Sequence, residues 1–371
     1  MKLFALSLAA YGSALDFDDV DFANANRAAI AARVNGDPSS SWVAATTGAQ
    51  LGRFANTSYS VLRSLAGVLG GDPTENEAGL PTRTLAETSA AYAARFGGGS
   101  SLPVSFDAGR YWSAQCGSII AEIRDQSACG SCYAVSAASV ASDRFCIAHN
   151  GTRSARLSGV DLMSCCKTCA GSNGGCFGGT PSKCWDYIST QGIATGAAHG
   201  DKSACLEYPF AECAHHDPAS PLPACPDTPY NAPTCFWACD SGPGANTGKH
   251  TYDGDQAAHK FATSYKVAAK AAAIQGEIAT HGPVQASMFL TADFEVYRSG
   301  VFTTTSTDYV GAHAVRIVGW GTDAGAGKEY WKVANSWNDG WGEAGYFRIE
   351  RGANILQIEA GVVAGTVHAR K

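Results

Sequence analysis

Charge is scarce in this sequence, and neither sign is concentrated. Charged residues make up 16% of its 371 residues, the formal net charge is −6, and no run of five basic residues occurs. Such a chain offers no evident surface for nucleic acid or for an anionic membrane. Hydrophobic residues reach 45% and glycines number 42, so we expect a folded, loop-rich protein rather than a disordered one.

Long apolar runs are missing after the first residues, since no later segment approaches the roughly 20 residues that span a bilayer. The chain opens with an apolar stretch behind Met1-Lys2, and Gly12-Ser13-Ala14 supplies the small residues that a signal peptidase reads. We therefore expect residues 1–14 to be a signal peptide, with a frayed or core-docked N-terminus as the alternative. The expected location is the secretory pathway, ending in a lysosome, a vacuole or the extracellular space. Sequons at Asn56 and Asn150 fit a glycoprotein.

Cysteine is absent from residues 15–101, whereas all 14 cysteines lie between Cys116 and Cys239. This density favours disulfides formed in an oxidising compartment. The spacing of Cys166 and Cys169 raises a zinc site as the alternative, but no second pair of Cys or His residues lies nearby at finger-like spacing. We expect neither a metal nor another cofactor.

Composition changes near residue 100. The run Gly97-Gly98-Gly99-Ser100-Ser101 predicts a flexible linker open to proteases. Residues 15–101, which include this linker, are expected to form a small, mostly helical pro-segment. The evidence is two alanine-rich stretches at 26–34 and 84–96 and a spaced apolar set at 59–69. Leu102 is then the expected start of a mature domain over residues 102–371.

Within residues 102–371 a helical half precedes a sheet half. Apolar residues at steps of three and four predict a buried helix over 132–145. Short β-rich runs follow at 314–320, 330–334 and 346–350, separated by glycine-rich turns. This order predicts the α+β class.

The start of the predicted helix carries a candidate nucleophile. A helix N-terminus beside a histidine lowers the pKa of a thiol, which is what a cysteine nucleophile needs. The string Cys129-Gly130-Ser131-Cys132-Tyr133 fits the Cys-Gly-Ser/Ala-Cys-Trp/Tyr signature of papain and the cathepsins. Two later strings, His313-Ala314-Val315-Arg316-Ile317 and Asn335-Ser336-Trp337, match the other two motifs of that family. The chain resembles papain-family cysteine proteases.

The resemblance implies a two-lobed fold, a helical lobe plus a β-barrel-like lobe, with the active site in the cleft between them. It implies that Cys132 is the nucleophile, that His313 is the general acid and base, and that Asn335 orients the imidazole. The side chain of Gln126 and the backbone N–H of Cys132 would hold the oxyanion. Trp337 would shield the His313–Asn335 contact, and Gly178 and Gly179 would pair with the substrate backbone.

His313 follows Cys132 by 181 residues, more than the about 130–150 of the plain papain pattern. The excess matches an insertion at residues 205–239, which resembles the occluding loop of cathepsin B. In that enzyme type the histidines corresponding to His215 and His216 bind the C-terminal carboxylate of a peptide, and Asp125 tethers the loop through His215. We therefore expect dipeptidyl carboxypeptidase activity together with endopeptidase activity.

Several positions depart from the cathepsin B pattern. Leu222 and Gly340 stand where a second ion pair tethers the loop, although the neighbouring Asp339 offers part of that role, so we expect a looser loop with appreciable endopeptidase activity. Gly361 replaces an acidic residue of the main specificity pocket, which predicts a preference for bulky apolar residues over arginine. Further differences are Phe177 and Thr180 in the unprimed cleft, and Tyr133 and Ala312 beside the catalytic residues.

The resemblance also implies a disulfide pairing, which leaves two cysteines unpaired, Cys132 and Cys184. The implied pairs are Cys116–Cys146, Cys129–Cys176, Cys165–Cys235, Cys166–Cys169, Cys205–Cys239 and Cys213–Cys225. Buried packing is the expected role of Cys184.

The expected partners are peptide and protein substrates, and the pro-segment is expected to act as an intramolecular inhibitor of a monomeric enzyme. Two alternatives stay open. One is a general endopeptidase of the cathepsin L type, against which the two histidines of the 205–239 insertion argue. The other is a catalytically silent, protease-like binding protein, in which Ser typically replaces the residue at Cys132.

Overall fold

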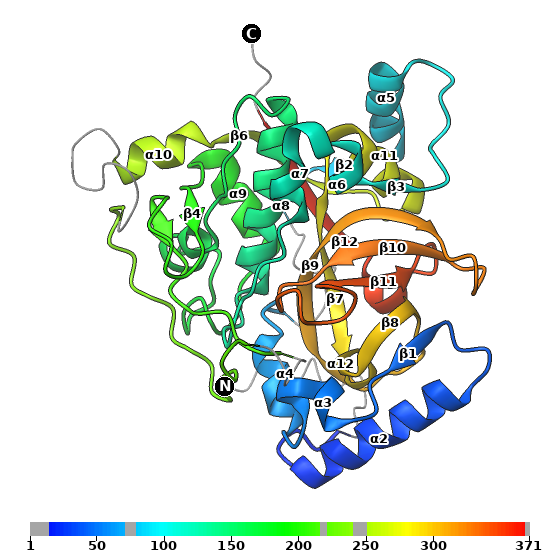
Figure 1. Ribbon diagram of the computed structural model, residues 1–371. Coiled ribbons are helices and arrows are strands. Elements are labelled where there is room, and N and C mark those ends of the chain that lie inside the picture. The colour runs from blue at the N-terminus through cyan, green and yellow to red at the C-terminus, as the bar shows by residue number, and fades with distance from the viewer. Residues whose placement is uncertain (1–14, 71–78, 216–220, 240–250, 368–371) are drawn as a thin grey trace.

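Two structural layers meet along one long buried helix. The structure is a computed structural model that describes residues 15–70, 79–215, 221–239 and 251–367. The expected signal peptide at 1–14 and His216 lie outside these described residues. Figure 1 shows the helices between residues 113 and 258 on one side of the molecule and a large sheet on the other, with further helices around the sheet. The predicted α+β class is confirmed.

The helical layer is built around α8 (Cys132–Ala148), which extends the predicted helix by three residues. Residues 132–147 of α8 are all buried, and alanine and serine at seven of these sixteen positions let neighbouring elements approach closely. The hydroxyls of Ser136, Ser139 and Ser142 donate to the carbonyls four residues earlier, which satisfies these polar groups inside the layer. The other helices of this layer are α6 (Ala108–Tyr111), α7 (Ser113–Ala121), α9 (Pro181–Thr190) and α10 (Tyr252–Ala258), with a π-helical turn at Asp161–Cys165.

The sheet layer has the strand order β1-β8-β11-β10-β9-β7-β12-β6-β2, with β3 paired to β9. Its long central strand β9 carries His313 in register with Met288 of β7. The strands are β1 (Trp42–Ala44), β2 (Thr82–Arg83), β3 (Phe106–Asp107), β6 (Phe261–Val267), β7 (Val284–Thr291), β8 (Tyr297–Phe302), β9 (Tyr309–Thr322), β10 (Glu329–Ala334), β11 (Tyr346–Glu350) and β12 (Gly361–Val367). Two helices, α11 (Ala271–His281) and α12 (Ala292–Glu295), flank β7, a 3-10 turn spans Ile355–Gln357, and a separate pair is formed by β4 (Gly196–Ala197) and β5 (Leu206–Glu207).

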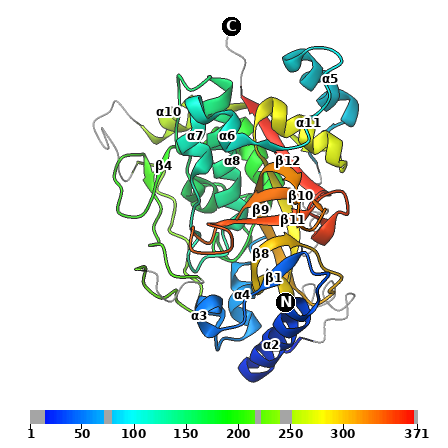
Figure 2. The same ribbon diagram turned by 45° about the vertical axis from the view of Figure 1, so that its right-hand side comes forward.

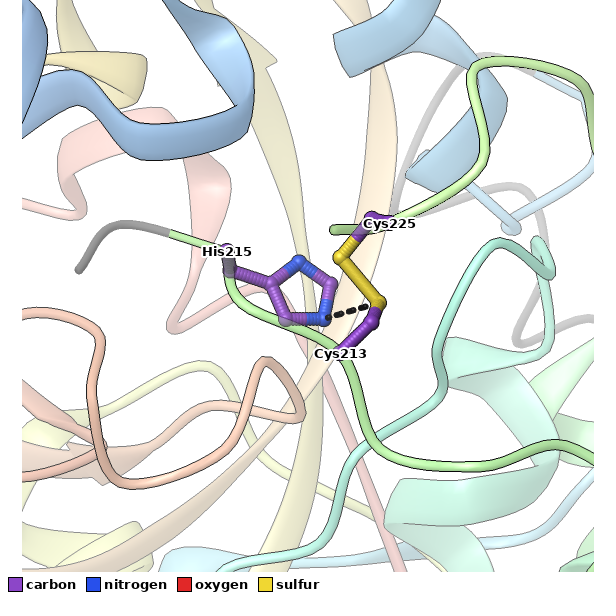
Figure 3. Close-up of side chains that lie close together, drawn as sticks. All are labelled: Cys213, His215 and Cys225. Atoms are coloured by element: carbon purple, nitrogen blue, oxygen red, sulfur yellow. Dashed lines mark hydrogen bonds between the residues drawn. A yellow bond between two sulfur atoms is a disulfide. The ribbon is translucent and has the colours of Figure 1, made fainter. Parts of the chain in front are cut away.

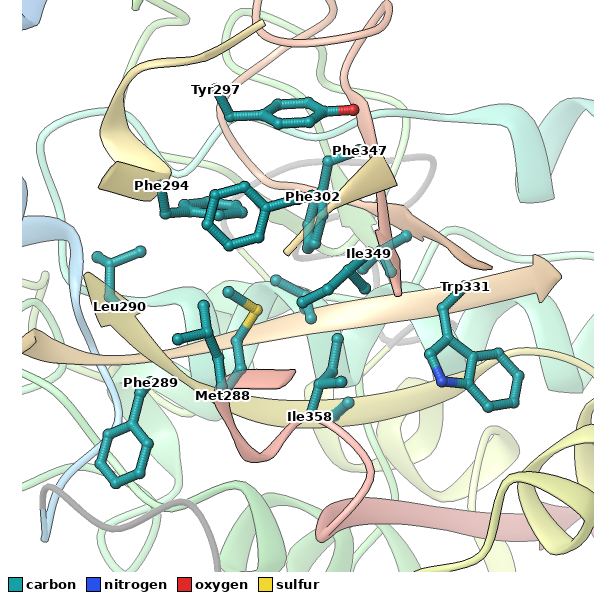
Figure 4. Packing of buried hydrophobic residues seen from close by; sticks show 14 of the residues in the cluster. Met288, Phe289, Leu290, Phe294, Tyr297, Phe302, Trp331, Phe347, Ile349 and Ile358 are labelled. Atoms are coloured by element: carbon teal, nitrogen blue, oxygen red, sulfur yellow. The ribbon is translucent and has the colours of Figure 1, made fainter. Parts of the chain in front are cut away.

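Aromatic side chains dominate the core beneath the sheet. Figure 4 shows Phe294, Tyr297, Phe302 and Phe347 packed together, and all four are fully buried. Burial of each such side chain contributes about 1.5–3 kcal/mol to stability. This core holds β7 and β10 rigidly, and these strands in turn position His313 and the residues after Ala334.

Residues 15–101, called the N-terminal segment below, run from one end of the molecule to the other. Figures 1 and 2 show its helices α2 (Val20–Gly36) and α5 (Leu85–Phe96) at opposite ends. Between them lie α3 (Gly48–Leu51), a 3-10 turn at Gly52–Phe54 and α4 (Tyr59–Leu65). Its strand β1 pairs with β8 and its strand β2 pairs with β6, so the segment adds one strand to each end of the sheet.

The predicted helices at 26–34 and 84–96 are present. Asp19 caps the first, which begins earlier than expected, and Thr84 with Glu87 forms a capping box on the second. The apolar set predicted over 59–69 is helical only to Leu65. The helix ends there because Gly67 passes so close to Gly130 that a Cβ atom would lie 2.0 Å from its carbonyl oxygen.

Six disulfides cross-link the region between Cys116 and Cys239. They are Cys116–Cys146, Cys129–Cys176, Cys165–Cys235, Cys166–Cys169, Cys205–Cys239 and Cys213–Cys225, the pairs that the resemblance implies. Cys132 and Cys184 remain as buried free thiols. In the part of the chain that the structure describes, no helix has both the length and the apolar character to cross a membrane.

Candidate active site

Cys132 begins α8 and is completely buried. Its sulfur accepts hydrogen bonds from the backbone N–H of Gly67, at 3.2 Å, and of Ala314, at 3.4 Å. Burial raises the pKa of this thiol to about 11, although the backbone donors act in the opposite direction. The expected low pKa is therefore absent in this form of the protein, because the N-terminal segment covers the thiol and desolvation outweighs the helix N-terminus.

His313 lies on β9 and is held by Asn335, which follows β10. The Nε2 atom of His313 lies 2.8 Å from Oδ1 of Asn335, and that oxygen also accepts the N–H of Ser336 at 2.8 Å. Because an amide oxygen is an acceptor, Nε2 carries the proton and Nδ1 keeps the free electron pair. Burial lowers the pKa of His313 to about 4, against the raising effect of Asn335 and of the Leu65 carbonyl. The imidazole is therefore neutral here.

Gln126 is fixed from three directions. Its backbone N–H donates to the carbonyl of Ser336 at 2.8 Å, and its side-chain Oε1 accepts from the Ser336 hydroxyl at 2.6 Å. Its Nε2 donates to the backbone carbonyl of Cys129 at 2.8 Å and to that of Leu65 at 3.1 Å. The N-terminal segment thus occupies the donor that was predicted to hold an oxyanion. The orienting role of Ser336 was missed: this serine stands in the Asn335-Ser336-Trp337 string, but its residue type alone does not indicate that its hydroxyl holds Gln126.

Trp337 separates the two histidines of the site. Its ring lies 5.2 Å from that of His313 and stacks at 6.3 Å on that of His215. Phe54 of the N-terminal segment packs against it at 5.7 Å. Trp337 is fully buried, so both imidazoles are shielded from water on that side.

On the opposite side of Cys132, the N-terminal segment pairs with Gly179. Leu69 donates to the Gly179 carbonyl and Gly179 donates to the Gly67 carbonyl, both at 3.0 Å, and Val68 is paired in parallel with Gly179. A Cβ atom on Gly179 would lie 2.2 Å from the ring of Tyr133. Gly178 has a φ of +101°, which disfavours other residues. Both glycines are therefore required for this close backbone approach.

Asp125 forms a buried hydrogen-bonded pair with His215, which lies within the 205–239 insertion. Nε2 of His215 lies 2.7 Å from Oδ1 of Asp125, and Nη1 of Arg53 lies 3.2 Å from Nδ1 of His215. Although burial acts to raise it, the pKa of Asp125 is lowered by His215. The pKa of His215 is lowered by burial and by Arg53, against the effect of Asp125.

Asn338 makes a further link between the insertion and Asp125, which was not predicted from the sequence. Its Nδ2 donates to Oδ2 of Asp125 at 3.1 Å and to the carbonyl of Cys213 at 2.6 Å, so it links the insertion to the Asp125 loop. Asn338 has a φ of +51°, a left-handed conformation that asparagine tolerates. An asparagine before Asp339-Gly340 was the available signal for such a turn.

His215 also lies beside the Cys213–Cys225 disulfide, as Figure 3 shows. The ligand atoms of these three residues lie within 4.8 Å of one another among the described residues. Because each sulfur is bonded to the other, the group offers no thiolate to a metal in this oxidised form.

The departures from the cathepsin B pattern take the following positions. Asp339 is exposed and forms no salt bridge with the described residues, and the N–H of Gly340 donates to Oδ1 of Asn338. Leu222 is half-buried. Gly361 opens β12, buried and in register with Ser287. Phe177 is 44% exposed beside the Gly178 turn.

Cys184 lies inside α9 and is fully buried. Burial raises its pKa well above the ordinary value, which disfavours the reactive thiolate form.

The comparisons with known proteins bear on this arrangement. A family model described as "Papain family cysteine protease" matches residues 102–366. The chain belongs to this family. "Cathepsin B-like cysteine proteinase 4" of Caenorhabditis elegans is 44% identical over 267 residues, which are 71% of this chain and 75% of that protein. A "Cathepsin B-like cysteine proteinase" of Schistosoma japonicum is 41% identical over 266 residues, or 72% of this chain and 73% of that protein.

A solved structure extends the likeness to the N-terminal segment. "proCathepsin B S9 from Trypanosoma congolense" has a TM-score of 0.71 and 30% identity, and the match covers 93% of this chain and 98% of that one. This chain is therefore a cathepsin B-like cysteine protease precursor with the papain-like fold, and its enzymatic class is cysteine-type peptidase.

Proposed function

We propose that the mature enzyme cleaves peptide bonds through Cys132, His313 and Asn335, releasing C-terminal dipeptides and also cutting internal bonds. The observation that carries this is the 2.8 Å bond from His313 Nε2 to Asn335, beside the buried helix-start thiol. That bond leaves Nδ1 of His313 as the base, which is the arrangement that thiol activation needs.

In the proposed reaction, Nδ1 of His313 takes the proton from the Cys132 sulfur, and the thiolate attacks the substrate carbonyl carbon. Nε2 of Gln126 and the backbone N–H of Cys132 stabilise the resulting oxyanion. The C–N bond then breaks as the imidazolium gives its proton to the leaving amine. Water, deprotonated by the same imidazole, hydrolyses the thioester and frees the sulfur.

The N-terminal segment is proposed to hold the enzyme inactive until it is removed. Two contacts support this: the Leu65 carbonyl takes the Gln126 donor, and the Gly67 N–H is bonded to the Cys132 sulfur. Under this cover both the thiol and the imidazole are neutral, so no thiolate is ready. The exposed run at 97–101 is the proposed cleavage site, with Leu102 as the mature start and residues 1–14 as a signal peptide.

The 205–239 insertion is proposed to act as the occluding loop. Its His215, with His216, would bind the carboxylate of a peptide end, and Asp125 would tether it. In the precursor Arg53 occupies Nδ1 of His215, so carboxylate binding has to wait until Arg53 leaves. Because Leu222 and Gly340 replace the ion pair that would form a second tether, the loop would open often enough for cleavage of internal peptide bonds.

Specificity in the unprimed half is proposed to favour bulky apolar side chains. Gly178 and Gly179 would pair with the substrate backbone, as they do with residues 67–69 here. Val68 belongs to the buried cluster that holds Tyr133, Ala314 and Val363, and Gly361, two residues before Val363, carries no charge. A reporter with Phe at the residue before the cleavage-site Arg should therefore be cut faster than its Arg-Arg counterpart.

The remaining proposals concern context. The six disulfides and the sequons at Asn56 and Asn150 support passage through the secretory pathway to a lysosome, vacuole or the outside. We propose that the mature enzyme is a monomer acting on peptides and proteins.

An epoxysuccinyl thiol reagent tests the proposed function. The acid-matured enzyme should incorporate one equivalent at Cys132 and lose all peptidase activity, whereas the precursor at neutral pH should react slowly. The Cys132→Ala variant should take up no reagent and cut no peptide. Cleavage that survived this substitution would refute the assignment, and labelling without any peptidase activity would favour a silent binding protein. Release of internal fragments without dipeptides would favour the cathepsin L type.

A further inference from the structure

A fully buried carboxylate of the catalytic region faces the N-terminal segment. Glu295 ends α12, and its two oxygens are held by Arg27 of α2. Nε of Arg27 lies 2.7 Å from Oε2 and Nη2 lies 3.0 Å from Oε1, a bidentate geometry. The side chains are 2% and 0% exposed. The guanidinium also donates to the carbonyl of Thr57 at 2.7 Å and lies 5.0 Å from the centre of the Tyr59 ring.

The cations that act on Glu295 both come from the N-terminal segment. Arg27 forms its salt bridge, and Arg53 is the other positive group near enough to affect it among the described residues. Glu277, another fully buried glutamate among the described residues, differs because its partners are Arg83 of the N-terminal segment and Arg144 of α8, which lies outside that segment. When the segment leaves, Glu295 therefore loses its partners, whereas Glu277 keeps one. An unpaired carboxylate at a newly opened surface is a ready binding site for a cation.

Glu295 lies on the leaving-group side of Cys132. Its neighbour Phe294 packs 6.2 Å from Trp337, which lies 5.2 Å from His313. The N-terminal segment runs from Phe54, on Trp337, through Leu65, at Gln126, to Leu69, at Gly179. Figure 1 shows α12 at the sheet edge where α2 and α3 lie. Because Gly178 and Gly179 are proposed to hold the acyl half of the substrate, the Trp337 side holds the amine half.

We propose that Glu295 is a specificity-determining residue that binds the side chain of a basic residue in the first two positions after the scissile bond. Two ring contacts separate Glu295 from His313, a span that about two or three residues of extended peptide cover at about 3.3–3.6 Å each. Arg27 fills this place in the precursor with the same guanidinium chemistry. Arginine should bind better than lysine, since only its planar fork makes two parallel hydrogen bonds to a carboxylate. This inference rests on the proposed function, because it needs a substrate in the cleft.

Matched quenched peptides test the proposal on the acid-matured enzyme. The peptides are identical except that the first or second residue after the scissile bond is arginine or citrulline, its neutral isostere. We expect kcat/KM to be about tenfold higher for arginine at one of these positions. In Glu295→Gln the arginine-to-citrulline ratio should fall to about one. Glu329→Gln removes an equal charge from an exposed glutamate paired with Arg351, and it should leave the ratio unchanged.

Each outcome decides the question. Equal cleavage of the arginine and citrulline peptides by the unaltered enzyme overturns the proposal and needs no variant. An equal loss of preference in Glu329→Gln also overturns it, because the preference would then reflect overall charge. If the Glu295→Gln precursor does not mature, Glu295→Asp replaces it as the test. This variant keeps the negative charge for Arg27 but shortens the side chain by one methylene, so the arginine-to-citrulline ratio should fall several-fold. Failure of the proposed function looks different, since then neither peptide is cut through Cys132.

Discussion

The N-terminal segment holds the two sides of Cys132 by different chemistry. On the Gly179 side the contacts are backbone hydrogen bonds from residues 67–69, with Val68 in an apolar cluster. On the Trp337 side the ring of Phe54 packs on Trp337, and two arginines make polar contacts, Arg53 with His215 and Arg27 with Glu295. Backbone pairing depends on shape and responds little to pH or salt, whereas buried charges respond strongly to loss of a partner or a proton. Docking of the segment should therefore depend little on pH on the Gly179 side, whereas on the Trp337 side it should depend on the charge and protonation of the contacting groups.

The largest effect should follow from breaking the charged side at Arg27. Arg27→Leu leaves Glu295 buried without its partner, and removal of one member of a buried pair costs about 3–5 kcal/mol. We expect docking of the segment to weaken by more than about 100-fold, seen as faster labelling of Cys132 by a thiol reagent in the intact precursor at neutral pH. Arg33→Leu, which changes an exposed arginine of the same helix, is the matched control. Equal labelling rates for the two variants would contradict the prediction.

A smaller effect is expected from breaking the backbone side at Gly67. A Cβ atom there would lie 2.0 Å from the Gly130 carbonyl oxygen and 3.0 Å from the Cys132 sulfur. Gly67→Ala should cost about 1–3 kcal/mol of docking free energy, since a close-packed site has to shift, and should speed labelling by about 5- to 150-fold. Gly36→Ala serves as the control, because a Cβ on Gly36 meets nothing within 4 Å. A rate in Gly67→Ala no higher than in this control would show that the segment does not depend on this close approach.

The backbone side was also the more predictable one from sequence. Cys132 stands in a local string at a helix start, and the family resemblance that this string carries implied the roles of the glycines at 178 and 179. His313 and Asn335 meet because β9 pairs with β10, and the β-rich runs predicted both strands. The helix at 59–65 followed from its apolar spacing, but its end depends on the clash between Gly67 and Gly130, which no local pattern contains.

The charged side could not be predicted from sequence. Arg53 meets His215 across 162 residues, and Arg27 meets Glu295 across 268. Neither arginine stands in a motif, and a lone glutamate after an apolar strand usually lies at the surface. The expected low pKa of Cys132 failed for a related reason. A helix start favours the thiolate, but burial by a distant part of the chain reverses that effect in the precursor.

The smallest effect, counted for each pH unit, concerns pH, and it sharpens the comparison. His215 and His313 both have pKa values lowered under the segment, that of His313 to about 4. A group that docks in its neutral form supports docking above its ordinary pKa of about 6.5 and loses that support as pH falls toward the docked value. Each such group adds up to about tenfold weakening per pH unit. Glu295, whose pKa burial raises to about 7, acts in the opposite sense and offsets part of this.

We therefore expect docking to weaken by up to about tenfold per unit between pH 6.5 and 4. The measure is hydrogen exchange of the Leu69 N–H in a Cys132→Ala precursor, corrected for the intrinsic pH dependence of exchange, with the N–H of Val333 in the sheet core as the internal reference. Arg53→Met removes the cation that opposes protonation of His215, so its pH dependence should be shallower, while Glu295→Gln should make it steeper. The prediction would be wrong if protection of the Leu69 N–H stayed constant or rose on acidification while protection of the Val333 N–H was unchanged. Protonation of His215 and His313 would then not be what weakens docking on the Trp337 side.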